Sequence, residues 1–407
     1  MRMRSLRLGF VLIAVAVSVL VALIGCGSGP TFSPSSNSSS GSSSGFGSGQ
    51  TQPEIPALLI ADSYNNRILM FDSPFSAGES ATTVLGQADF TSSVQATTIS
   101  GFWNPVSAVT DAQGNIWVSD WGNSRVLRYS PPFTNGMAAN LVLGQTNFTT
   151  GGKSGTQSGL SLPHGLAFDK AGNLWVADSY NARVLEFSPP FSSGMSASLM
   201  LGQPGFNNGV CSGTASASSL CYPSDLTFDA NGDLWVVDDD ENRVVEFRPP
   251  FVSGESASIV LGQQDFSSKV QGTGAAGLGL PWGAAFDQSG NLWVSDGDNW
   301  RVLEFTAPFS NGQAAILVLG FPDFTATVNK NLQSNMSNPR GVAFDKAGNL
   351  FVADNGGSRV LLFAPPFSDG MNATGVIGQP SLTTVGAATA PPTASGLANP
   401  VGIFIAY

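Results

Sequence analysis

Short apolar runs separated by turn-forming residues recur along most of the chain. In one stretch, the runs Leu174–Asp178 and Arg183–Phe187 flank a short segment with the composition of a tight turn. An apolar run over residues 163–169 precedes them. A fourth run, residues 197–203, follows a Pro-Pro-Phe connection that cannot continue a strand ladder, because proline lacks the amide donor. The pattern predicts a unit of four antiparallel strands.

This arrangement of positions occurs six times. In each copy an aspartate ends the second run and an arginine five residues later begins the third. Successive aspartates are 58, 58, 60, 58 and 58 residues apart, which is the period of one supersecondary unit. We interpret each pair as a structural turn support, in which the carboxylate accepts turn amides and pairs with the guanidinium. The pairs are Asp62 and Arg67, Asp120 and Arg125, Asp178 and Arg183, Asp238 and Arg243, Asp296 and Arg301, and Asp354 and Arg359.

The two ends of the repeat array indicate a closed ring. The first copy starts at its second strand, residues 58–62, without a preceding inner strand. The last segment, residues 399–407, matches the start of an inner strand at residues 338–344 and stops there. A strand from the C-terminus can therefore complete the first sheet and leave no exposed edges. The sequence predicts an all-β fold, a six-bladed β-propeller of four-stranded antiparallel blades over residues 54–407.

The recurring elements resemble a known repeat. Pro-x-Gly-x-x-x-Asp, Gly-Asn-φ-Trp-Val-x-Asp and Asp-x-x-Asn-x-Arg-Val-φ-x-Phe are similar to the NHL repeat, and the resemblance spans residues 57–407. The resemblance implies a β-propeller and is much less specific for function. The copies here are longer than is usual for the family, because of the Pro-Pro-Phe connection and the long loop after each Leu-Gly-Gln.

Residue types that recur in every copy are expected to be structural. One second-strand position is aromatic in most copies, and we expect it to pack between blades; it holds Trp117, Trp175, Trp235, Trp293 and Phe351, with Leu59 in the first copy. The connections carry a phenylalanine expected in the core, namely Phe75, Phe133, Phe191, Phe251, Phe309 and Phe367. The third turn position is expected to be left-handed, and it holds Asn65, Asn123, Asn181 and Asn299, with Gly357 and Glu241 in the other copies.

The N-terminus has the order of a secretory signal. Arg2, Arg4 and Arg7 precede an uncharged apolar run over residues 8–24. The run ends in Leu-Ile-Gly-Cys, which resembles the bacterial lipobox and implies cleavage before a lipidated Cys26. The alternative is a membrane-spanning anchor, since the run approaches the minimum span of about 17 residues. We favour the lipoprotein, with residues 1–25 as its signal peptide.

Residues 26–53 are expected to form a disordered linker that tethers the propeller to the membrane. The segment is almost entirely Ser, Gly, Pro, Thr and Asn, so it cannot bury enough apolar surface to offset the entropy of ordering. A coil of this length spans about 30 Å. Glycine rather than aspartate follows the cysteine, which in bacterial lipoproteins resembles an outer-membrane address. The expected localisation is the cell envelope, with the propeller exported and facing the periplasm or the surface.

Composition limits the classes of partner. Of 407 residues only 11% are charged, and the formal net charge is -11. A nucleic acid is therefore an unfavourable partner, because its binding requires a basic surface. A protein, peptide or glycan remains open, and we expect a monomer. Cys211 and Cys221 lie in the long loop of the one repeat that is two residues longer. In an exported protein they predict a disulfide, with metal ligation as the lesser alternative.

The candidate binding residues are those at which the copies differ. Following the strand directions, the turns, the long loops and the first residues of the inner strands share one rim around the axis. The residue after each inner-strand proline is unlike its counterparts, and Asp225 replaces the glycine that usually follows it. We expect a ligand there, although tolerated variation at a solvent-filled mouth is the alternative. These rim residues are Val106, His164, Ser224, Trp282, Arg340 and Val401, with Asp225.

Two functions remain open from the sequence, and binding is preferred to catalysis. The chain lacks a phosphate loop, a nucleophile elbow and a Cys-x-x-Cys pair, so we expect no catalytic residues, no cofactor and no metal. The preferred function is a lipid-anchored binding or scaffold module. The alternative is a metal-assisted lyase or lactonase with its site in the funnel. Lyases of similar fold use several histidines, whereas His164 is the only one here.

Calcium has two candidate positions in the sequence. Lactonases of similar six-bladed shape use carboxylates near the axis, and among the rim residues only Asp225 provides one. The acidic turn Asp238–Glu241, with Asp233 nearby, is the other position. Its spacing does not follow the alternating EF-hand loop, so we favour a solvated turn there.

Overall fold

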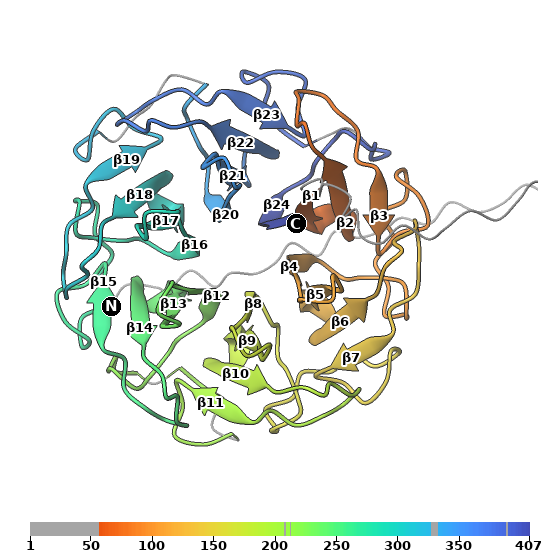
Figure 1. The fold of residues 1–407 in the computed structure, drawn as a ribbon, viewed down its shortest axis with the longest axis horizontal. Coiled ribbons are helices and arrows are strands. Elements are labelled where there is room, and N and C mark those ends of the chain that lie inside the picture. Colours follow the sequence, from red (N-terminus) through yellow and green to blue (C-terminus); the bar gives the residue numbers. More distant parts are fainter. Residues whose placement is uncertain (1–56, 207–208, 212, 327–332, 388–389) are drawn as a thin grey trace, which may run out of the picture. The chain divides into compact units, whose positions relative to one another are not determined.

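The computed structural model describes residues 57–206, 209–211, 213–326, 333–387 and 390–407. The segments predicted as signal peptide (1–25), lipidated Cys26 and linker (26–53) lie outside the described residues. Six four-stranded antiparallel sheets are arranged as blades around one axis (Figure 1). The predicted fold, a six-bladed β-propeller, is confirmed.

The strands of each blade follow one another from the axis outward, and in blades 1 to 5 a short 3₁₀ turn joins the second strand to the third. Blade 1 contains β24 (Pro400–Ala406), β1 (Ala57–Asp62), η1 (Ser63–Asn65), β2 (Arg67–Asp72) and β3 (Thr83–Leu85). Blade 2 contains β4 (Pro105–Thr110), β5 (Ile116–Asp120), η2 (Trp121–Asn123), β6 (Arg125–Tyr129) and β7 (Leu141–Leu143). Blade 3 contains β8 (Leu166–Phe168), β9 (Leu174–Asp178), η3 (Ser179–Asn181), β10 (Arg183–Phe187) and β11 (Leu199–Leu201).

The remaining blades repeat this order. Blade 4 contains β12 (Pro223–Phe228), β13 (Leu234–Asp238), η4 (Asp239–Glu241), β14 (Arg243–Phe247) and β15 (Ile259–Leu261). Blade 5 contains β16 (Pro281–Phe286), β17 (Leu292–Asp296), η5 (Gly297–Asn299), β18 (Arg301–Phe305) and β19 (Leu317–Leu319). Blade 6 contains β20 (Pro339–Phe344), β21 (Leu350–Asp354), β22 (Arg359–Phe363) and β23 (Gly375–Ile377).

The C-terminal strand completes the first blade. β24 pairs antiparallel with β1, and Ala406 lies opposite Ala57 in the register. The carboxylate of Asp62 also accepts the amide of Ala398 at 2.7 Å, which fastens the start of the last inner strand to the first turn. The first and last parts of the chain therefore share one sheet, as Figure 1 shows where the last strand, β24, lies beside β1.

Aromatic side chains fill the space between neighbouring blades. Trp175 is fully buried and packs edge-to-face against Phe251 and Phe228 of blade 4, with ring centroids 4.9 and 5.9 Å apart. The same contact recurs between Trp117 and Phe191. The recurring tryptophans and connection phenylalanines thus pack between blades, as their repetition indicated. Such edge-to-face pairs contribute about 0.5–1.5 kcal/mol each beyond the area they bury.

The predicted left-handed turn position is wrong by one residue. The asparagine at the third turn position keeps a helical turn, and its amide instead donates to the turn aspartate, as Asn181 does to Asp178 at 2.8 Å. The next residue is left-handed in every copy, whatever its type, because the chain must reverse there to start the third strand. These residues are Asn66, Ser124, Ala182, Asn242, Trp300 and Ser358, with φ between 51 and 56°.

The inner strand of blade 3 is shorter than the run 163–169 predicted. It covers only Leu166–Phe168. Upstream, the amide of Gly165 donates to the carbonyl of Ser224 in the next inner strand, while the Gly165 carbonyl accepts the amide of Ala177 in its own blade. Neighbouring inner strands come this close because the blades converge at the axis.

Candidate functional site

Buried ion pairs hold the turns that surround the axis. In blade 3, Arg183 Nε lies 2.7 Å from Asp178 Oδ2, and both side chains are fully buried. The other carboxylate oxygen accepts the amide of Ser161 at 2.6 Å, and the guanidinium donates to the carbonyl of Gly159 at 3.0 Å. Ser161 and Gly159 belong to the loop that arrives from blade 2, so each pair joins two blades. The other pairs are Asp62–Arg67, Asp120–Arg125, Asp238–Arg243, Asp296–Arg301 and Asp354–Arg359, at 2.7–2.9 Å.

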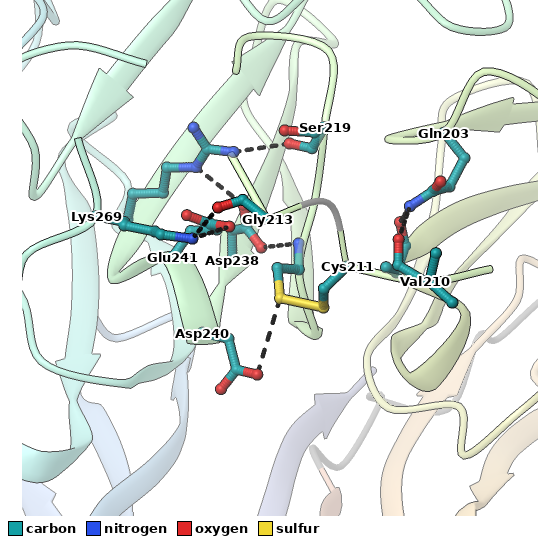
Figure 2. The surroundings of a disulfide bond; sticks show 12 residues. Gln203, Val210, Cys211, Gly213, Ser219, Asp238, Asp240, Glu241 and Lys269 are labelled. Carbon is teal, nitrogen blue, oxygen red and sulfur yellow. Dashed lines mark hydrogen bonds and ion pairs between the residues drawn. A yellow bond between two sulfur atoms is a disulfide. The ribbon is translucent and has the colours of Figure 1, made fainter. Parts of the chain in front are cut away.

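A disulfide reinforces the corresponding loop of blade 4. Cys211 and Cys221 are bonded, as predicted, which removes both sulfurs from the lesser alternative of metal ligation. Figure 2 shows the bond beside the turn aspartate, Asp238, whose carboxylate accepts the amide of Cys221 at 2.6 Å. The cross-link therefore fixes the loop at the point where the buried pair holds it.

The acidic turn of blade 4 differs from the predicted solvated turn, because its carboxylates have separate surroundings. Asp238 pairs with Arg243, and Glu241 is buried with Lys269 Nζ at 3.6 Å. Only Asp240 in this turn is exposed, and its carboxylate lies 3.9 Å from the Cys221 sulfur (Figure 2).

The seven candidate rim residues converge on one small cavity at the axis. Its volume is about 40 Å³, room for a few atoms and not for a whole ligand. Backbone from the glycines of the inner strands completes the wall. The mouth is therefore a narrow recess and not a wide funnel. The seven residues that line it are Val106, His164, Ser224, Asp225, Trp282, Arg340 and Val401.

Aromatic rings and one guanidinium group stack at this mouth. The guanidinium carbon of Arg340 lies 3.3 Å from the ring centroid of Trp282, and that ring is 5.2 Å from the imidazole of His164. Tyr222 contacts the imidazole from another side, with its hydroxyl 3.4 Å from Nε2, and Trp121 approaches it edge-on. This short distance is that of a cation–π contact between the guanidinium and the indole.

The stack keeps the histidine neutral. Burial, and to a lesser extent the positive charge of Arg340, lower the pKa of His164 to about 3. Arg340 therefore provides the positive charge in the stack at physiological pH. Burial shifts the pKa of Asp225, at the inner end of the recess, in the opposite direction. It raises this pKa to about 7, against the lowering effect of hydrogen bonds from the amides of Ala284 and Leu226.

A constriction separates this recess from a wider channel. A Cβ on Gly283 would lie 2.6 Å from the Arg340 carbonyl, and one on Gly341 would lie 2.7 Å from the Val401 carbonyl. Glycine is required at these positions because the inner strands almost touch. Beyond them lies a channel of about 400 Å³ lined by all six inner strands. Asp225 borders both spaces.

The turns around the mouth expose further aromatic residues. Tyr64 is 66% exposed, Tyr180 56% and Trp300 51%, and all three lie in the turns between second and third strands. Sequence reasoning treated these turns only as supports and also missed Tyr222 and Trp121. The usable signal was position: Tyr222 directly precedes an inner-strand proline, and Trp121 is the first residue of its turn.

Comparison with known proteins identifies the repeat that forms the blades. Residues 102–129, 160–187 and 336–363 match the NHL repeat. The chain contains NHL repeats. It is 27% identical over 271 residues to peptidyl-glycine alpha-amidating monooxygenase B of Xenopus laevis, an alignment that covers 65% of this chain and 26% of that protein. The NHL propeller thus spans about a quarter of the length of this relative.

Solved structures similar to this NHL propeller support the fold alone. One is a chain of a nidogen/laminin complex, with 17% identity, a TM-score of 0.51 and coverage of 86% of this chain and 98% of that one. Another is a protein of unknown function from Bacteroides caccae, with 11% identity, a TM-score of 0.50 and coverage of 86% and 99%. Among the described residues, no helix is long and apolar enough to span a membrane.

Proposed function

We propose that this NHL propeller is a binding module of the cell envelope, held by a lipid on Cys26 and presenting its axial mouth to a protein, peptide or glycan. The main observation is that the residues that break the sixfold repetition line one recess. Repetition maintains the scaffold, so unlike residues gathered at one place are best explained by a ligand. The disulfide is consistent with an exported protein.

The chemistry of the recess favours an anionic group on that ligand. Arg340 supplies a positive charge over Trp282, and His164 stays neutral and can donate or accept a hydrogen bond. A volume of about 40 Å³ admits a carboxylate while the rest of the ligand stays outside. There the exposed aromatic rings of Tyr64, Tyr180 and Trp300 offer flat surfaces to a sugar ring or a side chain.

The alternative function is a metal-assisted lyase or lactonase, for which the axis offers few metal-ligating side chains. The recess contributes one carboxylate, Asp225, and one imidazole, His164. Among the described residues, the one compact group of three His, Cys, Asp or Glu ligand atoms is Cys211, Cys221 and Asp240, whose two sulfurs are bonded to each other. The described donors do not fit a metal site with three or more side-chain ligands at the axis.

Affinity capture from envelope extract tests the proposal. The full chain should recover a partner that the double variant Trp282→Ala and Arg340→Ala fails to recover. Ile316→Ala is the control, because this residue is 57% exposed and precedes an outer strand, away from the mouth. Equal recovery by all three proteins would contradict a binding site at the mouth. Stoichiometric metal in the purified protein, lost in Asp225→Asn, would support the alternative.

A further inference from the structure

The hairpin between the first two strands of blade 4 departs from its counterparts at one residue. In blade 5, the amide of Asn291 bridges two carboxylates, donating to Asp287 and to Glu304 at 2.9 Å each. Asn115, Asn173 and Asn349 likewise donate to the aspartate of their own hairpins. Blade 4 has Asp233 at this position. The Asp233 carboxylate, a hydrogen-bond acceptor, therefore occupies the position at which these other hairpins have an asparagine amide, a donor.

The substitution brings three carboxyl groups together without the bridging amide. Asp229, Asp233 and Glu246 correspond to Asp287, Asn291 and Glu304 of blade 5. Burial and then the negative charge of Asp229 raise the pKa of Asp233. Burial also raises the pKa of Glu246, with Arg248 opposing it and the two aspartates adding to it. Burial, together with the negative charge of neighbouring carboxylates, thus disfavours the charged forms of Asp233 and Glu246.

A second, independent observation shows that the local hydrogen bonding is incomplete. In blades 2, 3 and 5 the tryptophan of the second strand donates its indole N–H to the hairpin aspartate, as Trp117 does to Asp111 at 2.8 Å. In blade 4, Trp235 is fully buried, and its indole N–H has no hydrogen-bond partner within the described part of the chain. Its counterparts show that this donor belongs beside the Asp229 carboxylate.

These groups border a cavity between blades 4 and 5. Its volume is about 340 Å³, and its lining includes the three carboxyl groups and Ile259 of blade 4 together with Pro308 and Phe309 of blade 5. Arg248 also lines it and lies 2.8 Å from Glu246, but the arginine side chain is 54% exposed. The cavity therefore combines apolar side chains with three carboxyl groups and one largely exposed guanidinium.

We propose that this cavity binds the side chain of a lysine or arginine from a partner peptide. The methylene stem would lie along Ile259, Pro308 and Phe309, and the cationic head would donate to the carboxyl groups, replacing the amide that the sister hairpins provide. A bare metal ion fits less well, because the ligand oxygens of this trio are not among the compact groups found in the described residues. The site is separate from the axial mouth.

The direct test is binding of a fluorescent peptide of alternating glycine and lysine to the full chain, measured by anisotropy. Asp233→Asn recreates the hairpin of the sister blades, so it should fold and should weaken binding about tenfold, the ratio expected from losing one hydrogen bond to a charged group. A peptide with norleucine in place of lysine keeps the stem without the charge and should not bind.

Two further variants separate the cavity from general attraction to an acidic protein. Asp298→Asn removes one exposed negative charge in the turn of blade 5 and should leave binding unchanged. Asn291→Asp on the Asp233→Asn background returns the net charge to that of the parent without rebuilding the trio that lines the cavity, so binding should stay weak. The proposal is overturned if Asp298→Asn weakens binding as much as Asp233→Asn, if Asp233→Asn binds like the parent, or if the norleucine peptide binds equally.

Discussion

The role of a residue in this propeller can be inferred by comparing it with the residues at the same position in the other five blades. A residue that recurs in every blade, such as the turn aspartate, is buried and paired with the arginine of its own turn, as a structural support would be. A residue that differs marks local chemistry. Asp225 occupies a position that four other blades give to glycine, and its carboxyl group lies at the constriction between the recess and the channel.

The first prediction concerns the pH dependence that Asp225 introduces. Its pKa is about 7 in the folded protein and near 3.8 in the unfolded chain. Between about pH 4 and pH 7 the folded protein holds a proton that the unfolded chain has released, so this group makes stability fall as pH rises. His164 has the opposite effect. Between about pH 3 and 6.5 its side chain is neutral in the folded protein and protonated in the unfolded chain, so this group makes stability rise with pH.

Asp225→Asn should therefore gain stability relative to the parent as the pH is raised. We expect the difference in melting temperature between the variant and the parent to increase from about pH 4 to pH 8, because only the parent acquires a buried charge in this range. Calorimetric melting of both proteins at the two pH values measures this. A difference that stays constant with pH would show that the carboxyl group titrates normally.

At the scale of elements, the blades are joined by polar contacts as well as by the aromatic core. Each buried Asp–Arg pair holds a turn of its own blade and a loop that arrives from the preceding blade. The glutamine of Leu-Gly-Gln adds another brace, as Gln203 donates to the carbonyls of Ala182 and Val210 (Figure 2). The loops around the mouth are therefore fixed by buried donors and acceptors.

Asp178→Asn should strongly destabilise the propeller. The change leaves the buried guanidinium of Arg183 without its counter-ion, which costs about 3–5 kcal/mol when one partner of a buried pair is removed. Asp298→Asn, an exposed change of the same type, should cost less than about 0.5 kcal/mol. Denaturant unfolding of the two variants measures the contrast. Similar midpoints for both would mean that the buried pair contributes little.

At the scale of the whole molecule, the ring depends on one strand supplied by the far end of the chain. β24 covers the inner edge of β1, whose residues Leu58 and Ile60 are fully buried. Without it, blade 1 would have a free edge facing the axis, and Val401 would be missing from the recess. The last strand, β24, therefore contributes both to stability and to the candidate site.

Deleting residues 400–407 should remove most of the folding free energy, which is typically about 5–15 kcal/mol for a domain. The reason is that the deletion exposes the core-facing edge of β1 and opens the ring. Deleting Tyr407 alone, which is 41% exposed, is the matched control and should change the melting temperature little. Circular dichroism melting compares the two. An unchanged transition after the longer deletion would contradict closure by β24.

The sequence alone determined the fold, because six copies of one pattern with complementary ends allow few arrangements other than a closed ring. It also identified the rim residues, since strand direction brings the start of every inner strand to the same end of the axis. It could not place the left-handed residue of the turns, which backbone geometry and not residue type decides.

Only the tertiary structure decided how the rim side chains meet. The stack at the mouth joins residues that are far apart in the sequence: Trp282 follows His164 by 118 residues, and Arg340 follows Trp282 by 58. Their contact depends on how closely three blades approach the axis. The same is true of the cavity at Asp233, whose lining combines Ile259 of blade 4 with Pro308 and Phe309 of blade 5. Such contacts join separate repeats, so no pattern within one repeat contains them.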